Sequence, residues 1–515
     1  MRGFPPGLAP VRAATLVAVG TGLILGATYL SEPVSLVRGV PSAQASGPQA
    51  DPVTRTRSVC PGPEALGVEG LHGSSVQTVS VAAASAPALA LPAGTATGVG
   101  GSLRFGGLPA GGAWPGPASV RGQVISGPVS TARSALASAN GAMAPGAAAT
   151  QWSWTRTGTS RGLSTAACLP GRASAWLVGG GAAPGRLEHV VLANPGPNPV
   201  TVDLRTLGVR GPIESPDAQG LVVAGRSRTV ILLDAIAGAE PSPVVHVTVR
   251  GGAVAATLSD TWLDGVVPRG GDDVVSLVGP AREQVIPGVP VHGKAVLRVG
   301  VPGDIEAVVQ SRVLTPGGPE VLPAGGVTRV AGGSTKDIDL SSLPPGSYAV
   351  QVRADVPVVA AVMVDRRRAA GAGSDLAWAV ATAPIRALAG MPLPSFAGQG
   401  VTQRLDLVAT GGAASVLVTT VDAQGRAGAK EVAIRADSVS TVPLSGVTSV
   451  WVTPLAGIVR AAVLSSVTDA AGILLSVTPV ADLTLTDTPA PLRQLADQPG
   501  AALAGRSPYG ARSTR

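Results

Sequence analysis

Cys60 and Cys168 are the only cysteines of this 515-residue chain and its most reactive side chains. In an oxidising compartment they would form a disulfide, and closing so long a loop removes about 4–5 kcal/mol of chain entropy from the unfolded state. Two buried free thiols are the alternative. The four histidines are isolated, and none stands at metal-ligand spacing from a cysteine. We therefore predict a Cys60–Cys168 disulfide and no metal site.

No residue is assigned to nucleophilic catalysis. We expect no Gly-x-Ser-x-Gly nucleophile elbow, since the serine within 505–510 misses the spacing, and no lysine follows a serine by three positions. His189 and His246 lie on predicted strands, where an ordinary surface or packing role is expected. We predict no catalytic residue, no cofactor, and a protein that is not an enzyme.

Four aspartates are candidates for chemistry. Asp272 and Asp273 form the best carboxylate pair, and a Ca²⁺ ion bound there is conceivable. A calcium loop normally supplies several oxygen ligands close together, so we interpret the pair as a polar turn between strands. Asp260 and Asp365 occupy equivalent positions in two repeats and are interpreted as strand-end residues.

Trp152 and Trp154 lie two positions apart, so on a strand they share one face. If exposed, the pair could stack on a sugar ring; if buried, it would supply core to a chain with only 3% aromatic residues. Packing in the core is the favoured interpretation. The pair is nevertheless the candidate ligand-stacking site of the sequence.

The composition of the chain indicates which secondary-structure elements hold these residues in place. The chain has 69 Gly, 46 Pro and 45% hydrophobic residues but only 13% charged ones, which favours many short strands joined by tight turns. The net charge of +7 could suit an acidic partner, but the basic residues are scattered and aromatics are scarce. We therefore predict a mostly β protein that does not bind nucleic acid.

A strand–corner–strand pattern recurs three times along the chain, at 190–209, 296–315 and 405–424. The period of roughly 105–110 residues is close to the size of an immunoglobulin-like sandwich. Within the first copy, Val200, Val202 and Leu204 alternate with polar residues, which predicts strands with one buried face. Further predicted strands recur at corresponding positions in each copy. The pattern predicts tandem antiparallel sandwiches.

The N-terminus indicates the compartment. Residues 13–30 carry no charge and are just long enough to span a bilayer as a helix, and arginines precede them. A cleaved signal peptide is the alternative, but its best small-residue site, at Ala43 and Ala45, lies far beyond the apolar stretch. We predict a single-pass anchor with the bulk of the chain outside the cytoplasm, or secretion after cleavage.

The predicted fold class is all-β: tandem antiparallel immunoglobulin-like β-sandwich repeats behind an N-terminal transmembrane helix. In chain order, the predicted parts are a cytoplasmic tip (1–12), the transmembrane signal anchor (13–30), a flexible stalk (31–58), an irregular β-region holding the disulfide (59–189), sandwich repeats at 190–294, 295–403 and 404–490, and a disordered tail (491–515).

Several stretches carry a family resemblance: "CPGPE" at 60–64, "ACLPGRASAWLVGGG" at 167–181, "LANPGPNPVTVDL" at 192–204 and "DTWLDGVVPRGGDDVV" at 260–275. With them the chain resembles an actinobacterial family known as domain of unknown function 5719. The resemblance implies an exported or membrane-anchored protein whose role is not established, and it transfers no catalytic residue.

The expected function is that of a non-enzymatic cell-envelope protein, a structural or protein-interaction scaffold. The expected partner is an envelope protein or wall polymer, because sandwich edges and end loops are natural contact surfaces. The alternative is a glycan- or wall-polymer-binding module, for which exposure of Trp152 and Trp154 would speak.

Overall fold

The computed structural model describes residues 52–63, 65–66, 75–76, 78–95, 98–322, 326–367, 373–396, 400–469 and 472–486. The predicted tip, anchor and tail, and the stalk up to residue 51, lie outside the described residues. The described residues belong to one compact unit, which is all-β with several antiparallel sheets. No helix within the described ranges is long and apolar enough to span a membrane.

Four copies of one sheet pair follow each other along the chain, and we call them sandwiches 1 to 4. In each copy, one four-stranded sheet ends in the last strand of the copy; we call it the axial sheet and its last strand the axial strand. The axial sheets, in strand order, are β6(Ile125–Val129)-β4(Val79–Ser85)-β8(Ala147–Thr155)-β9(Gly162–Ala167), β15(Ser227–Leu232)-β11(Arg186–Asn194)-β17(Ala255–Asp264)-β18(Val267–Val275), β24(Thr335–Asp339)-β20(Lys294–Gly300)-β25(Gly346–Arg367)-β26(Ser374–Val380), and β31(Ser438–Pro443)-β28(Thr402–Ala409)-β33(Val459–Asp469)-β34(Gly472–Pro479).

The second sheet of each copy begins with the first strand of that copy. These sheets are β1(Arg55–Cys60)-β7(Ser134–Gly141)-β5(Gly101–Leu108), β10(Ser174–Val178)-β16(Val244–Arg250)-β12(Val200–Gly208) with β13(Gly211–Ile213) and β14(Leu221–Val223), β19(Ala281–Val291)-β25-β21(Ala307–Thr315) with β22(Gly318–Val321) and β23(Val327–Val330), and β27(Ala389–Pro392)-β32(Val447–Ala456)-β29(Ala414–Asp422)-β30(Ala427–Ile434). The long strand β25 serves both sheets of sandwich 3. Short elements complete the described chain: β2(Ala65–Leu66), β3(Ser75–Val76), α2(Leu233–Ala237) and two single 3₁₀ turns at Ala88–Ala90 and Pro216–Ala218.

Alternation of apolar residues builds the core between the two sheets of a copy. Val200, Val202 and Leu204 on β12 face Val190 and Leu192 on β11, and all five are buried. Each further copy has its own apolar core. The alternation read from the sequence therefore gives the correct buried face at this strand pair.

Strand pairing sets unit boundaries that differ from the predicted ones. The strands β10, β19 and β27 open sandwiches 2, 3 and 4, whereas the predicted repeats begin one strand later. The region predicted as irregular, 59–189, contains most of sandwich 1, whose axial sheet has the same strand order as the other three. Its long connections and many Ala and Gly residues hide this likeness in the sequence.

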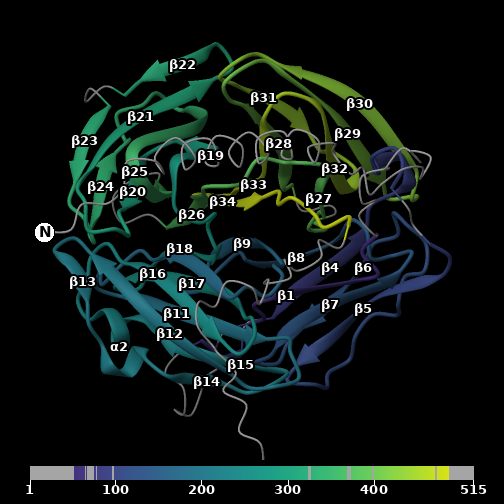
Figure 1. The fold of residues 1–515 in the computed structure, drawn as a ribbon, viewed down its shortest axis with the longest axis horizontal. Coiled ribbons are helices and arrows are strands. Elements are labelled where there is room, and N and C mark those ends of the chain that lie inside the picture. The colour runs from purple at the N-terminus through teal and green to yellow at the C-terminus, as the bar shows by residue number, and fades with distance from the viewer. Residues whose placement is uncertain are drawn as a thin grey trace, which may run out of the picture. The chain divides into compact units, whose positions relative to one another are not determined.

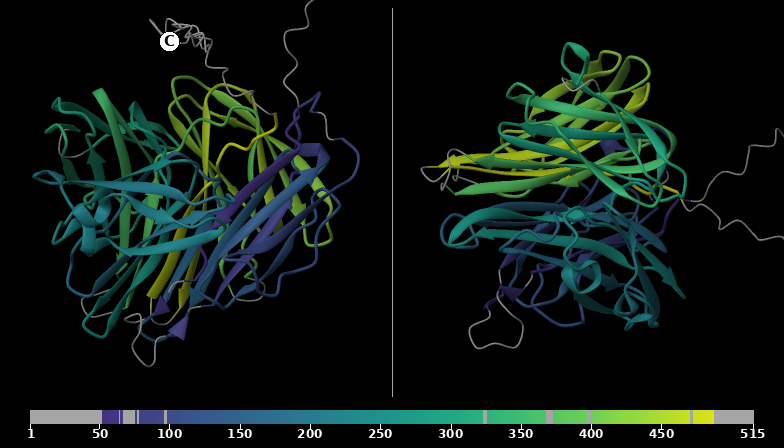
Figure 2. Two further views of the ribbon diagram at one scale, coloured as in Figure 1. Left: turned by 60° about the horizontal axis from the view of Figure 1, so that its bottom comes forward. Right: turned by 90° about the vertical axis from the view of Figure 1, so that its left-hand side faces the viewer.

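The four axial strands close a ring. β9 packs against β18, β18 against β26, β26 against β34, and β34 against β9. These strands lie around the centre of the view in Figure 1, with sandwiches 3 and 4 (green to yellow) above sandwiches 1 and 2. The two halves are again seen one above the other on the right of Figure 2. At the rim, Pro52 pairs with Thr486, so the first and last described segments lie side by side.

Candidate functional site

The ring is closed by side chains rather than by a continuous sheet. Each axial strand presents one polar side chain that accepts a hydrogen bond from a backbone N–H group of the next axial strand. The four bonds are Asp273 N to Ser164 Oγ (3.0 Å), Trp378 N to Asp272 Oδ2 (2.8 Å), Leu475 N to Asp375 Oδ2 (2.9 Å) and Thr165 N to Ser476 Oγ (2.9 Å). We call these four bonds the axial cycle. Because buried N–H groups are costly when unpaired, the cycle fixes the four sandwiches as one frame.

Two of the four acceptors are buried carboxyl groups. Asp272 is 4% exposed and Asp375 is completely buried. Burial raises the pKa of both groups well above the usual range, while backbone donors act in the opposite direction. Asp375 takes three such donors, the N–H groups of Leu163, Leu475 and Leu376. Both carboxyls therefore serve the frame of the ring.

Gly270 makes this approach of neighbouring strands possible. Its φ of +98° lies in the region that favours glycine, and a Cβ at this position would lie 2.1 Å from Oδ1 of Asp375. The segment predicted as a polar turn is thus part of β18, and Asp272 and Asp273 are strand residues rather than turn residues. The sequence could not show this, because the partners of Asp272 lie more than 100 residues away.

Asp260 differs from its interpretation as a strand-end residue. It lies inside β17, is fully buried, and binds Arg186 through Oδ1 (2.8 Å from Nε) and Oδ2 (2.5 Å from Nη2). Trp378 of sandwich 3 donates its Nε1–H to the same carboxylate at 2.9 Å. Asp260 therefore joins sandwich 2 to sandwich 3.

Apolar side chains pack across three of the four contacts between adjacent sandwiches, which we call seams. Met363 and Trp378 of sandwich 3 pack into the core of sandwich 2, and Leu464 and Leu475 of sandwich 4 pack into that of sandwich 3. In the seam between sandwiches 4 and 1, Phe396 joins Trp152 and Leu163 in one cluster. The seam between sandwiches 1 and 2 has a small apolar cluster and a cavity.

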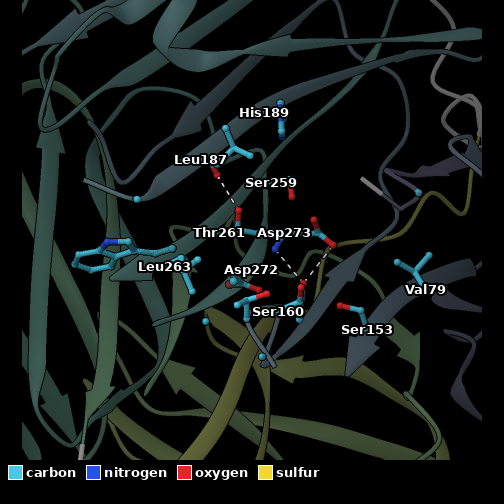
Figure 3. Close-up of a pocket in the computed structure, with 18 residues that line it drawn as sticks. Val79, Ser153, Ser160, Leu187, His189, Ser259, Thr261, Leu263, Asp272 and Asp273 are labelled. Carbon is cyan, nitrogen blue, oxygen red and sulfur yellow. Dashed lines mark hydrogen bonds between the residues drawn. The ribbon is translucent and has the colours of Figure 1, made fainter. Parts of the chain in front are cut away.

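This cavity, which we call the seam-1/2 cavity, has a volume of about 370 Å³, within the range of small-ligand sites. Its walls come from β8, β9 and the turn between them on one side and from β11, β17 and β18 on the other (Figure 3). Six hydroxyl side chains line it: Ser153, Thr159, Ser160, Ser164, Ser259 and Thr261. No Lys or Arg is among the described lining residues, whereas Asp272 and Asp273 are.

His189, Ser259 and Asp273 lie side by side on β11, β17 and β18. The Asp273 carboxyl accepts hydrogen bonds from Gln151 Nε2 (3.1 Å) and Ser164 Oγ (3.2 Å), and Ser259 also binds it. Burial raises the pKa of Asp273, and these three donors oppose the shift. Serine stands between histidine and aspartate, whereas a catalytic triad requires the histidine in the middle.

Ser160 is a second serine to consider. It is the centre of Gly158-Thr159-Ser160-Arg161-Gly162, which has the Gly-x-Ser-x-Gly spacing of a nucleophile elbow, so the expectation that this spacing is absent is wrong. An elbow connects a strand to a helix, but this segment connects β8 to β9. Ser160 has no hydrogen bond to any residue that the structure describes. Within the described residues, the motif therefore has neither the strand-to-helix elbow nor a base hydrogen-bonded to its serine.

The predicted disulfide is present. Cys60 at the end of β1 and Cys168 directly after β9 are bonded across the two sheets of sandwich 1, and both are buried. Gly62, two residues after Cys60, lines the seam-1/2 cavity and donates its N–H to Gln151 Oε1 at 2.7 Å. The disulfide therefore anchors one wall of the cavity.

The candidate stacking pair lies in another seam. Trp152 is 8% exposed, and its ring meets that of Phe396 edge-on at 6.4 Å between centroids. Trp154 is half-buried, with its ring 5.8 Å from Phe396 and under the guanidinium of Arg156. Trp152 therefore packs in the core, and both tryptophan rings contact Phe396. The structure instead gathers hydroxyl groups one seam away.

Sequence reasoning did not find Ser164, Asp375 and Ser476, three members of the axial cycle. The available signal is a polar residue within the last strand of a copy, clearest where that strand is largely apolar, as in β26 and β34. Asp272 stands out in the sequence because it adjoins a second aspartate. Among the described residues, no group of three His, Cys, Asp or Glu side chains could hold a metal ion.

Fold and site together define an all-β protein in which four pairs of antiparallel sheets close a ring around buried polar side chains. The chain belongs to the family of unknown function DUF5719, whose sequence model matches residues 124–445. No curated protein matches it.

A search of solved structures found a crystal structure of the tetra-tandem repeat in the extending region of a large adhesion protein. It is 15% identical, covers 76% of this chain and 93% of the other, and has a TM-score of 0.10. A score this low carries no argument about fold or function.

Proposed function

We propose that this protein is a non-enzymatic saccharide-binding scaffold of the cell envelope, and that the seam-1/2 cavity takes a neutral sugar unit. The observation that carries the proposal is the lining of that cavity. Hydroxyl groups both donate and accept hydrogen bonds, as the hydroxyl groups of a sugar do. The side chains of Val79, Leu187 and Leu263 supply apolar wall for the faces of a sugar ring.

Charge narrows the ligand class. A phosphate or carboxylate in this cavity would meet Asp272 and Asp273 and no lining arginine or lysine, so an anion is disfavoured. A cation would compete with the uncharged donors that already bind Asp273. A neutral polyhydroxylated ligand avoids both difficulties.

The scaffold part of the proposal rests on the axial cycle and the apolar seams, which hold four sandwiches in fixed relation. Each copy has two antiparallel sheets and about the length of an immunoglobulin-like domain, and we propose that class for it. An extracytoplasmic location, with residues 13–30 as anchor or signal, is supported by the disulfide, which persists in oxidising compartments.

Calorimetric titration of the full chain with neutral monosaccharides and disaccharides tests the proposal. Thr261 is exposed, lies on β17 and lines the cavity, so Thr261→Trp would fill it without disturbing the core. We expect one neutral sugar to bind and this variant to lower the affinity at least about tenfold. The matched control is Thr468→Trp, an exposed threonine on β33 in another seam, which should bind the sugar as the natural chain does.

Two results would overturn the proposal. One is that none of the neutral sugars binds at millimolar concentration. The other is that Thr261→Trp and the control variant bind equally well. Release of a hydrolysed sugar that disappears in Ser160→Ala would replace the binding function by an enzymatic one.

A further inference from the structure

A second cavity, of about 340 Å³, lies in the seam between sandwiches 3 and 4, and we call it the seam-3/4 cavity. One of its walls comes from β28, β33 and β34, the counterparts in sandwich 4 of the strands β11, β17 and β18 that line the seam-1/2 cavity. Its polar side chains are different, however. They are His292, Ser347, Arg366, Arg404, Ser466 and Thr468.

No carboxylate among the described residues pairs with the guanidinium of Arg366. Arg366 lies near the end of β25 and is half-buried, and its Nε is buried without a hydrogen-bond partner. Within the described ranges it forms no ion pair. Burial and the neighbouring Arg404 both lower the pKa of Arg366, because each disfavours its charged form.

Arg404 has one carboxylate partner, which is already in use. Its Nε lies 3.2 Å from Oδ1 of Asp406. The fully buried Asp406 also accepts hydrogen bonds from Ser347 Oγ (2.7 Å) and Thr441 Oγ1 (2.9 Å). Asp406 therefore balances at most one of the two guanidinium groups.

Asp375, the residue that pairs with Arg366 in the sheet, belongs to the frame. Asp375 stands directly opposite Arg366 in the β25–β26 ladder. Its two oxygens are occupied by three backbone N–H groups of the axial strands. His292 lines the same cavity, and its pKa is lowered by burial and then by Arg366 and Arg404, so its imidazole responds to their positive charge. Positive charge thus converges on this cavity without enough negative charge to balance it.

We propose that the seam-3/4 cavity binds a phosphate group, held between Arg366 and Arg404. Two guanidinium groups present more donors than the two oxygens of a carboxylate can use, whereas a phosphate offers three or four acceptor oxygens. The hydroxyls of Ser466 and Thr468 supply further donors. The volume leaves room for an organic group attached to the phosphate. This site is separate from the saccharide site, so either proposal can fail alone.

Titration of the full chain with inorganic phosphate at low ionic strength tests the inference. The informative variant is Arg366→Gln, because Arg366 has no ion pair to lose and the variant should fold normally. We expect its phosphate affinity to fall at least about tenfold. The matched control is Arg426→Gln, which removes one positive charge from an exposed position, and we expect it to bind phosphate as the natural chain does.

The filling variant Thr468→Trp provides an independent measurement, since it blocks the cavity and keeps both arginines. It should lose phosphate binding and retain sugar binding. Equal phosphate affinity in Arg366→Gln and the natural chain would overturn the proposal, as would an equal loss in Arg426→Gln. Absence of binding at millimolar phosphate would overturn it too.

The source of the phosphate is distinguished by two further probes. Tighter binding of glycerol 3-phosphate than of inorganic phosphate would identify a phosphate ester as the ligand, and equal affinity would identify free phosphate. Binding only to vesicles that contain phosphatidylglycerol, with neither soluble phosphate bound, would contradict a cavity site and indicate surface attachment.

Discussion

The seam-1/2 and seam-3/4 cavities use equivalent strands of one repeated fold and offer opposite chemistry. In the first, Asp273 is surrounded by hydroxyl and amide donors and no arginine lines the space. In the second, Arg366 and Arg404 both line the space, and the carboxylate of Asp406 pairs with Arg404 alone. The backbone frame therefore determines where a cavity can form, and a few side chains determine what it can bind.

The other two seams show how such a space is lost. Between sandwiches 2 and 3, Trp378 and the Arg186–Asp260 pair lie in the seam, and between sandwiches 4 and 1, Phe396 packs on two tryptophans. Large side chains close these seams and stabilise the ring through apolar burial. Binding and stability are thus assigned to different seams of one structure.

The largest expected effect comes from removing the disulfide, which should weaken ligand binding in one cavity and not in the other. In the double variant Cys60→Ala and Cys168→Ala, loss of the cross-link should lower the free energy of unfolding by about 4 kcal/mol. Sugar affinity should fall as well, because Gly62 follows Cys60 in the wall of the seam-1/2 cavity. Phosphate affinity should persist. Urea unfolding and the two titrations measure this, and an equal loss of both ligands would contradict a separation of the cavities.

The next largest effect is expected from Asp375, whose hydrogen bonds hold together the ring that forms both cavities. Asp375→Ala leaves the buried N–H groups of Leu163 and Leu475 without an acceptor, which should destabilise the protein by about 3 kcal/mol. Asp375→Asn keeps an acceptor oxygen and should cost less. Thermal unfolding of the two variants measures the difference. If Asp375→Ala left stability unchanged, the axial cycle would not hold the ring together.

A pH effect of about 3 kcal/mol is expected from Glu188, a buried residue of β11 in sandwich 2. Burial raises the pKa of Glu188 to about 7, above the 4.5 of the unfolded chain, and the nearby Asp260 adds to the shift. The folded state thus binds this proton more tightly, so the contribution is complete below pH 4.5 and disappears as pH rises through about 7.

Unfolding curves between pH 5 and pH 8 measure this effect. The natural chain should lose stability as pH rises over this window, and Glu188→Gln should lose less. Identical pH profiles for the two proteins would show that another group is responsible. Both ligand affinities serve as the control for an intact ring.

The smallest expected effect is on the stability of Arg366→Gln, and it tests the difference in charge between the two cavities. Without phosphate, Arg366→Gln should change the free energy of unfolding by less than about 1 kcal/mol, and in the stabilising direction, because it removes repulsion from Arg404. With phosphate present, the natural chain should be the more stable protein, since a ligand stabilises the state that binds it. Thermal unfolding with and without phosphate measures this crossover.

Features carried by local periodicity could be predicted from the sequence. The alternation of Val200, Val202 and Leu204 indicates a strand with a buried face, and the pairing of two lone cysteines follows from the predicted compartment. The axial cycle could not be predicted in this way. Asp375 looks like a loop residue until Leu163, more than 200 positions earlier, is placed beside it. Contacts between copies leave no period in the sequence.

The two cavities were hidden for a related reason. A cavity forms where side chains from two sandwiches fail to fill a seam, so neither Thr261 nor Arg366 signals it alone. The Gly-x-Ser-x-Gly spacing around Ser160 shows the opposite risk, since a motif can occur by chance in a hairpin. Tertiary position, rather than spacing, decides which of these residues face a ligand.

Pro52 pairs with Thr486, and Val53 N donates a hydrogen bond to Leu485 O at 3.1 Å, so the first and last described segments lie next to each other. A ring whose first and last segments adjoin does not depend on where the polypeptide is cut. Circularly permuted chains, joined across this point and opened between β18 and β19 instead, should assemble the same four sandwiches. The order of synthesis and the final architecture would then be independent of each other.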